Sequence, residues 1–201
     1  NLTGFAYTNF TSPADGADLR FAASNQADEL NYEIEKWDTN GASYVWVQVP
    51  WRADTNTRIW ALWNNPGAAM PAYATNGSSW TNGFVGVWHL NETTGLNRDA
   101  TTNLNHATTN NGVVQAALGM IGGAVSLDGV NDFLSVSNSA SLAVTNNFTA
   151  ELLVRRTADG VFDGFMSKSS AAANGWNLNF NNNVDKFAAY VAPVASAGYL
   201  N

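Results

Sequence analysis

Apolar and polar residues alternate with a period of two along much of this chain. Residues 43–49 read SYVWVQV, so Val45, Val47 and Val49 point to one face and the residues between them point to the other. The same pattern predicts strands, separated by clusters of Asn, Gly, Asp and Thr, at 31–38, 57–63, 84–90, 124–127, 133–136, 149–155, 165–168, 176–180 and 186–191. Helical periodicity is almost absent. Short strands at this spacing predict an all-β fold of antiparallel sandwiches.

Residues 70–83 interrupt this alternation and are rich in turn-forming residues. We therefore predict two tandem antiparallel β-sandwich domains, at residues 1–82 and 83–201.

The composition narrows the classes of partner. The 201-residue chain carries a net charge of -7, and only 12% of its residues are charged. A chain so short of positive charge is unsuited to neutralising phosphates, which argues against nucleic acid. The longest apolar run, residues 112–125, is too short to span a bilayer, so no membrane insertion is expected. The absence of cysteine excludes disulfides and thiolate metal sites.

Residues 15–50 contain three strand motifs: Asp-Leu-Arg-Phe at 18–21, Tyr-Glu-Ile-Glu at 32–35 and Val-Trp-Val-x-Val-Pro at 45–50. A Trp63-Asn64-Asn65-Pro66 turn follows. These motifs resemble a bacterial and archaeal family called domain of unknown function 2341. The family usually has Gly at the position of Asn64.

The second half carries GVWHLNE, RDATTNLNHAT, GGAVSLDGVNDFLSV and FTAELLVRR in that order. These segments resemble the laminin-G-like domains of the concanavalin A-like lectin/glucanase superfamily. The resemblance implies a jelly roll, here a partial one. Both families normally have strands beyond the ends of this sequence, so we expect the rest of the protein or a neighbouring subunit to supply them.

One strand resembles a catalytic motif. Residues 33–38, EIEKWD, are similar to the Glu-Ile-Asp-x-x-Glu strand of lichenase-type glucanases, and Glu33 and Glu35 fall on one strand face. Two carboxylates about 5–5.5 Å apart suit a retaining glycosidase. The acids at Glu35 and Asp38 have the wrong lengths for this motif, however. We expect solvated strand acids, a structural role for His89, and no enzyme.

Eight tryptophans are candidates either for the core or for sugar stacking. Those that alternate within predicted strands, Trp46, Trp60 and Trp88, are expected to fill cores. The ligand-binding candidates lie at strand ends or in loops: Trp51, Trp63, Trp80 and Trp176.

The loop Asp128-Gly129-Val130-Asn131-Asp132 is predicted to be a hairpin turn, because Asp-Gly and Asn favour turn geometry. The laminin-G-like resemblance adds calcium (Ca2+) near one sandwich edge, held by oxygen ligands. It implies Asp99 and Asp128 as the metal ligands.

Together these features predict a non-catalytic, extracellular or cell-surface recognition module that binds glycan or another surface polymer. A ligand-free structural spacer or filament subunit is the alternative. A glycoside hydrolase that uses Glu33 and Glu35 is the third hypothesis.

Overall fold

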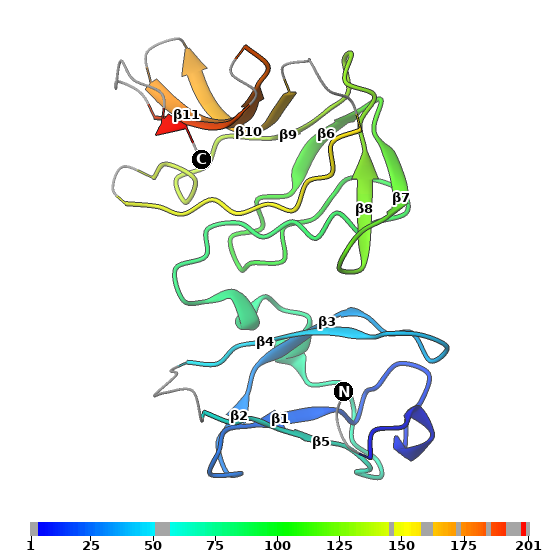
Figure 1. Cartoon of the computed structure of the whole chain (residues 1–201). Coiled ribbons are helices and arrows are strands. Elements are labelled where there is room, and N and C mark those ends of the chain that lie inside the picture. Colours follow the sequence, from blue (N-terminus) through cyan, green and yellow to red (C-terminus); the bar gives the residue numbers. More distant parts are fainter. Residues whose placement is uncertain are drawn as a thin grey trace. The chain divides into compact units, whose positions relative to one another are not determined.

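The computed structural model describes residues 4–50, 57–144, 147–157, 163–171, 174–183, 186–191 and 198–199. It is all-β, as predicted, and every named strand pair is antiparallel (Figure 1). The helical elements of the described residues are the short 3-10 turns η1 (Tyr7–Asn9), η2 (Ala72–Ala74) and η3 (Ser78–Trp80). The described part contains no helix with the length and apolar character needed to cross a membrane.

The chain divides into two compact units, Asn1–Asn147 and Phe148–Asn201. The first unit contains a three-stranded sheet of β2 (Glu29–Leu30), β1 (Arg20–Ala22) and β5 (Trp60–Leu62). It also contains three strand pairs: β3 (Tyr32–Lys36) with β4 (Tyr44–Val47), β6 (Ala107–Asn111) with β9 (Phe133–Val136), and β7 (Val114–Leu118) with β8 (Gly123–Ser126). The predicted domain boundary after residue 82 stays a prediction.

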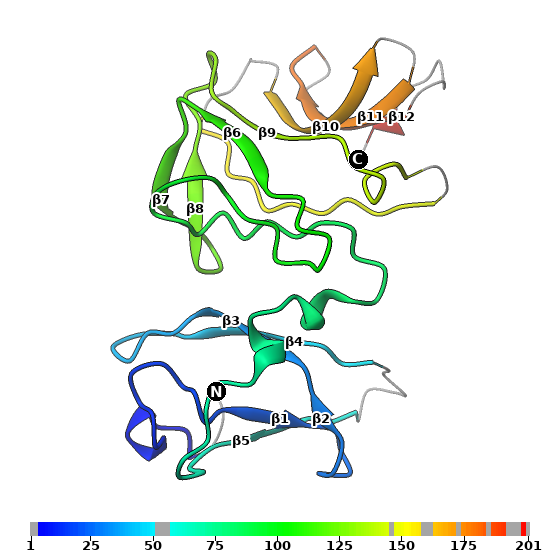
Figure 2. The same cartoon turned by 180° about the vertical axis from the view of Figure 1, so that it is seen from behind.

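The β3–β4 hairpin packs over the β2–β1–β5 sheet in a sandwich-like arrangement, which both views show (Figures 1 and 2). Tyr32 is fully buried in the core between them and donates its hydroxyl hydrogen bond to the Leu19 carbonyl at 2.7 Å. Val45 and Val47 of β4, which the alternation places on one face, both pack against this core. The remaining buried apolar residues of the cluster are Phe10, Leu19, Phe21, Leu30 and Ala74.

The second unit is a meander of β10 (Asp163–Ala171), β11 (Asn174–Asn181), β12 (Lys186–Val191) and β13 (Gly198–Tyr199). Phe180 and Ala188 are buried on it. The guanidinium of Arg156 lies 3.4 Å from the centre of the Phe180 ring and pairs with Asp163 at 2.6 Å. The concanavalin A-like jelly roll stays a prediction.

Two predicted strands are wrong. Residues 84–90 form only an isolated bridge between Trp88 and Asp99, because the Val87 amide donates to the Asp99 carboxylate at 2.9 Å instead of joining a ladder. Residues 149–155 have no strand partner, and Leu153 is 64% exposed. Conversely, β6 and β7 were not predicted, since β6 is a polar ATTNN segment with no apolar alternation.

Candidate ligand-binding site

The second face of the β3–β4 hairpin, opposite the core, carries acids and an indole. Glu33 of β3 pairs in register with Trp46 of β4, and Glu35 lies two residues further along β3. Because strand side chains alternate, these residues face away from the Tyr32 side of the hairpin. The prediction that Glu33 and Glu35 share one strand face is thus confirmed.

His89 binds both carboxylates. Its Nδ1 lies 2.5 Å from Oε2 of Glu35, and its Nε2 lies 3.4 Å from Oε1 of Glu33. The Trp46 indole and the Asn91 amide also donate to Glu35, at 2.9 and 3.0 Å. We call these residues, with Trp80, whose indole N–H donates to Glu33, the His89 cluster.

The expectation that both acids are solvated is wrong for Glu35, whose side chain is only 1% exposed. The turn between β7 and β8 explains this burial. Gly122 has φ +70°, and a Cβ there would lie 2.5 Å from Oε1 of Glu35. A Cβ at Gly123 would lie 2.7 Å from the Cα of Asn91. The two glycines let the backbone of this turn cover the carboxylate, so a side chain at either position would open the cluster.

The cluster carries opposite charges at neutral pH. Burial lowers the pKa of His89, but the hydrogen bonds and charges of Glu33 and Glu35 outweigh it and raise this pKa to about 9. Burial raises the pKa of Glu35, but hydrogen bonds from His89 and Trp46 outweigh it and lower this pKa. An imidazolium therefore sits between two carboxylates, with a formal net charge of one negative unit.

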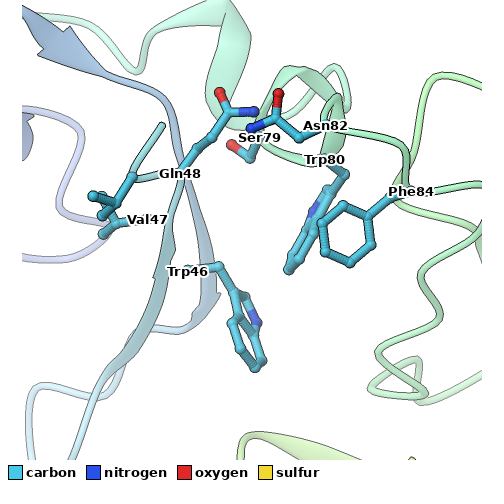
Figure 3. A pocket seen from close by; sticks show the side chains of 8 residues that line it. Trp46, Val47, Gln48, Ser79, Trp80, Asn82 and Phe84 are labelled. Carbon is cyan, nitrogen blue, oxygen red and sulfur yellow. The ribbon is translucent and has the colours of Figure 1, made fainter. Parts of the chain in front are cut away.

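A hollow of about 190 Å3 opens beside this cluster. Figure 3 shows the rings of Trp80 and Phe84 side by side, with the Trp46 indole across from them. The Trp80 ring centre lies 5.3 Å from Phe84 and 5.6 Å from Trp46. We call this the aromatic hollow, and its lining is Trp46, Val47, Gln48, Val49, Ser79, Trp80, Asn82 and Phe84.

Polar groups gather at one end of the aromatic hollow (Figure 3). The Ser79 hydroxyl is buried and has no hydrogen-bond partner among the described residues. Asn82 is exposed, and its amide makes no hydrogen bond within the described chain. Gln48 is already engaged, since it accepts from Asn31 and donates to Thr81 at 2.7 Å. Ser79 and Asn82 are therefore the polar groups of the hollow whose hydrogen-bonding capacity is unused within the described chain.

The tryptophan candidates fall in different environments. Trp80 lines the aromatic hollow. Trp63 instead packs in the core of the first unit, stacked 5.7 Å from the Phe10 ring. Trp176, in the second unit, contacts Phe148 with ring centres 5.2 Å apart, and its indole N–H is buried without a partner in the described part. Trp51 lies outside the described residues.

The carboxylates of the two predicted metal ligands accept hydrogen bonds from nearby backbone amides. Asp99 is 3% exposed, and its carboxylate accepts hydrogen bonds from the amides of Val87, Thr101 and Asn105. Asp128 is exposed and caps its turn by accepting from the Val130 amide at 2.8 Å. Within the described ranges, no three His, Cys, Asp or Glu side chains are grouped in a way that would hold a metal ion. Calcium stays a prediction.

The fold and site define an all-β protein with an aromatic hollow beside a buried His–carboxylate cluster. The model of a family described as "Domain of unknown function (DUF2341)" matches residues 15–104. This confirms the first predicted resemblance, and the matched range includes the aromatic hollow and the His89 cluster. No curated protein and no solved structure matches the chain significantly. The laminin-G-like resemblance of the second half is supported by none of these matches.

Sequence reasoning missed most of the hollow. Trp46 was assigned to the core, and Phe84, Ser79 and Asn82 were not considered as ligand contacts. The alternation in β4 does place Trp46 and Gln48 opposite the core valines. That signal was sufficient to suggest a second functional face, but not to say which distant residues meet it.

Proposed function

We propose that this protein is a non-catalytic recognition module that binds glycan through the aromatic hollow. The observation that carries the proposal is the combination of three aromatic side chains, Trp46, Trp80 and Phe84, with the unpaired hydroxyl of Ser79. Binding sites typically combine an apolar lining with a few polar groups that orient the ligand.

A sugar ring suits this combination because it has apolar C–H faces and a rim of hydroxyls. Aromatic rings present large, rigid apolar surfaces on which such a face can pack. Phe84 is 50% exposed, so its ring is accessible without any rearrangement of the core. The hydroxyl of Ser79 and the amide of Asn82 would meet the sugar hydroxyls.

The environment of Glu35 argues against its use as the general acid of a glycosidase. A glycosidase acid needs a raised pKa so that it holds a proton at neutral pH. The pKa of Glu35 is lowered instead, chiefly by its hydrogen bonds from His89 and Trp46, which outweigh its burial. Both Glu33 and Glu35 contact the same imidazole. The cluster thus favours a structural role that supports the hollow.

The remaining features of the proposal follow the lectin-like resemblance of the second half. We place the protein outside the cell or on its surface, with a partial concanavalin A-like jelly roll after the first domain. Calcium bound through Asp99 and Asp128 is part of the same proposal. A rise of a few degrees in melting temperature in 10 mM calcium relative to EDTA would support it.

A ligand-free spacer is the second candidate, and one observation favours it. The His89 cluster joins residues distant in sequence, since Glu35 and Asn91 are 56 positions apart and bonded at 3.0 Å. A rigid connection of this kind would suit a structural unit in a surface protein.

A binding experiment separates the two candidates. The intact protein is titrated calorimetrically with oligosaccharides from glucans, galactans, mannans, xylans and chitin. Phe84→Ala should weaken binding about tenfold or more, because it removes an accessible aromatic contact worth at least about 1.4 kcal/mol.

Phe133→Ala is the matched control, since Phe133 is 48% exposed and does not line the hollow. It should leave affinity unchanged. If no oligosaccharide binds, the glycan proposal is wrong and the spacer is favoured. If both variants lose affinity equally, the aromatic hollow is not the binding site.

A further inference from the structure

We propose that the aromatic hollow selects an uncharged sugar ring and rejects rings that carry a carboxylate, such as uronic or sialic acid units. This inference rests on the proposed function, because it names the class of glycan that the same site would accept. Three features of the hollow lead to it: the engagement of its indole N–H groups, the charge behind it, and the kind of polar group left free.

The two indoles of the hollow present their ring faces to a ligand, but neither has a free N–H group to donate to it. The Trp46 N–H is donated to Glu35 at 2.9 Å, and the Trp80 N–H is donated to Glu33. A ligand carboxylate packed against these rings would find their N–H groups already used. A neutral ring, which packs through its C–H face, loses nothing by this arrangement.

The charge behind the indoles is negative. The two carboxylates that accept from the indoles share a single imidazole. The His89 cluster therefore carries a formal net charge of one negative unit. The Glu33 side chain is still 21% exposed and can therefore act on a neighbouring ligand. Like charges brought together in a partly desolvated site oppose binding.

Among the described residues, no positive side chain of the hollow's lining offsets this charge. This lining contains neither Lys nor Arg among the described residues. The nearest cation along β3, Lys36, pairs with Asp38 at 2.8 Å. Sites that recognise carboxylates typically present an arginine fork or a comparable cluster of charged donors. The described lining offers nothing of this kind.

The free polar groups suit hydroxyls. The Ser79 hydroxyl and the Asn82 amide can each donate and accept a hydrogen bond. Sugar hydroxyls do the same, so either partner can adopt the role the other needs. The volume of about 190 Å3 is below the roughly 300–1,000 Å3 of pockets for drug-sized ligands. It therefore leaves room for one ring of a longer glycan.

Matched oligosaccharides test the selectivity. The intact protein is titrated with methyl-esterified and unesterified oligogalacturonide hexamers, and with cello-oligosaccharides and their C6-oxidised counterparts, at 150 mM salt. In the pair that contains the better neutral ligand, the acidic partner should bind at least tenfold more weakly.

Two variants test the cause of the selectivity. Glu33→Gln retains an oxygen that can accept from Trp80 but removes one negative charge, so it should narrow the neutral-to-acidic ratio several-fold. Glu151→Gln removes the same charge from an exposed position in the second unit and should leave the ratio unchanged. Ser79→Ala should weaken the neutral ligand several-fold.

The outcomes are distinguishable. If neither ligand class binds, the proposed function fails and this inference fails with it. If acidic oligosaccharides bind as tightly as the neutral ones, glycan binding stands and the selectivity is wrong. If Glu33→Gln and Glu151→Gln change the ratio equally, the charge behind the indoles is not its cause.

Discussion

The β3–β4 hairpin has two faces that are stabilised in different ways. On one face, Tyr32 and Val45 pack into an apolar core. On the other, Glu35 and Trp46 are joined by hydrogen bonds and lie beside the imidazole of His89. Burial of apolar surface depends little on pH, whereas an ion pair depends on the protonation of both partners. The same two strands thus separate a structural face from a face that can respond to ligand and pH.

The largest loss of stability is expected on the core face. Tyr32→Ala removes a fully buried aromatic ring, so unfolding should become easier by about 3–5 kcal/mol. Tyr32→Phe is the control, because it keeps the ring and removes only the hydroxyl, with its hydrogen bonds to the Leu19 carbonyl and the Met70 sulfur, and it should lose about 1–2 kcal/mol. Urea unfolding measures both. A loss below about 1 kcal/mol for Tyr32→Ala would contradict the sandwich core.

A somewhat smaller loss is expected when the polar face loses its cation. His89→Ala leaves the carboxylate of Glu35 buried without its cation, which should cost about 3 kcal/mol. The double variant Glu35→Gln/His89→Ala removes the stranded charge, so it should lose less than the sum of the single variants. Strict additivity in urea unfolding would mean that the two side chains are not coupled.

The two faces should also differ in their response to alkaline pH. The pKa of His89 is raised to about 9 from 6.5, so its stabilisation is complete below pH 6.5 and is lost as the pH rises through 9. The loss should be roughly 3 kcal/mol, because each pKa unit corresponds to about 1.4 kcal/mol. His89→Ala should lack this component, while Tyr32→Phe should retain it. Equal alkaline losses in wild type and His89→Ala would contradict the assignment.

The loss of folding stability expected at acid pH has a different origin. Burial raises the pKa of Asp18, but amide hydrogen bonds from Thr11, Ser12 and Asn64 outweigh it and lower this pKa to about 2. Its stabilisation is present above the unfolded value of 3.8 and is lost as the pH falls toward 2. Asp18→Asn should therefore flatten unfolding stability between pH 4 and pH 2, as measured by thermal melts across that range.

Local patterns predicted a good part of the fold. The strand predicted at 133–136 coincides with β9, and that at 186–191 coincides with β12. Alternation also predicted that Val45 and Val47 share one face of β4, but it did not say which face is the core, and Trp46 on the other face was assigned to the core. It failed at 149–155, because an apolar segment forms a strand only where a partner strand is available.

The site depended on contacts that no local pattern encodes. Glu33 and Glu35 were correctly placed on one face, but their burial depends on His89 and on the glycine turn at Gly122. These residues lie more than 50 positions away, and only the folded chain brings them together. The solvated state expected for Glu35 was wrong for this reason.

The most direct test of the aromatic hollow is a titration with a neutral oligosaccharide followed by 1H–15N NMR. Signals of the indole N–H groups of Trp46 and Trp80, and of the Asn82 side-chain amide, should shift together in a saturable manner. The indole signals of Trp63, in the core, and of Trp176, in the second unit, should stay in place. Saturable shifts at Trp63 or Trp176, with the hollow unchanged, would contradict the account.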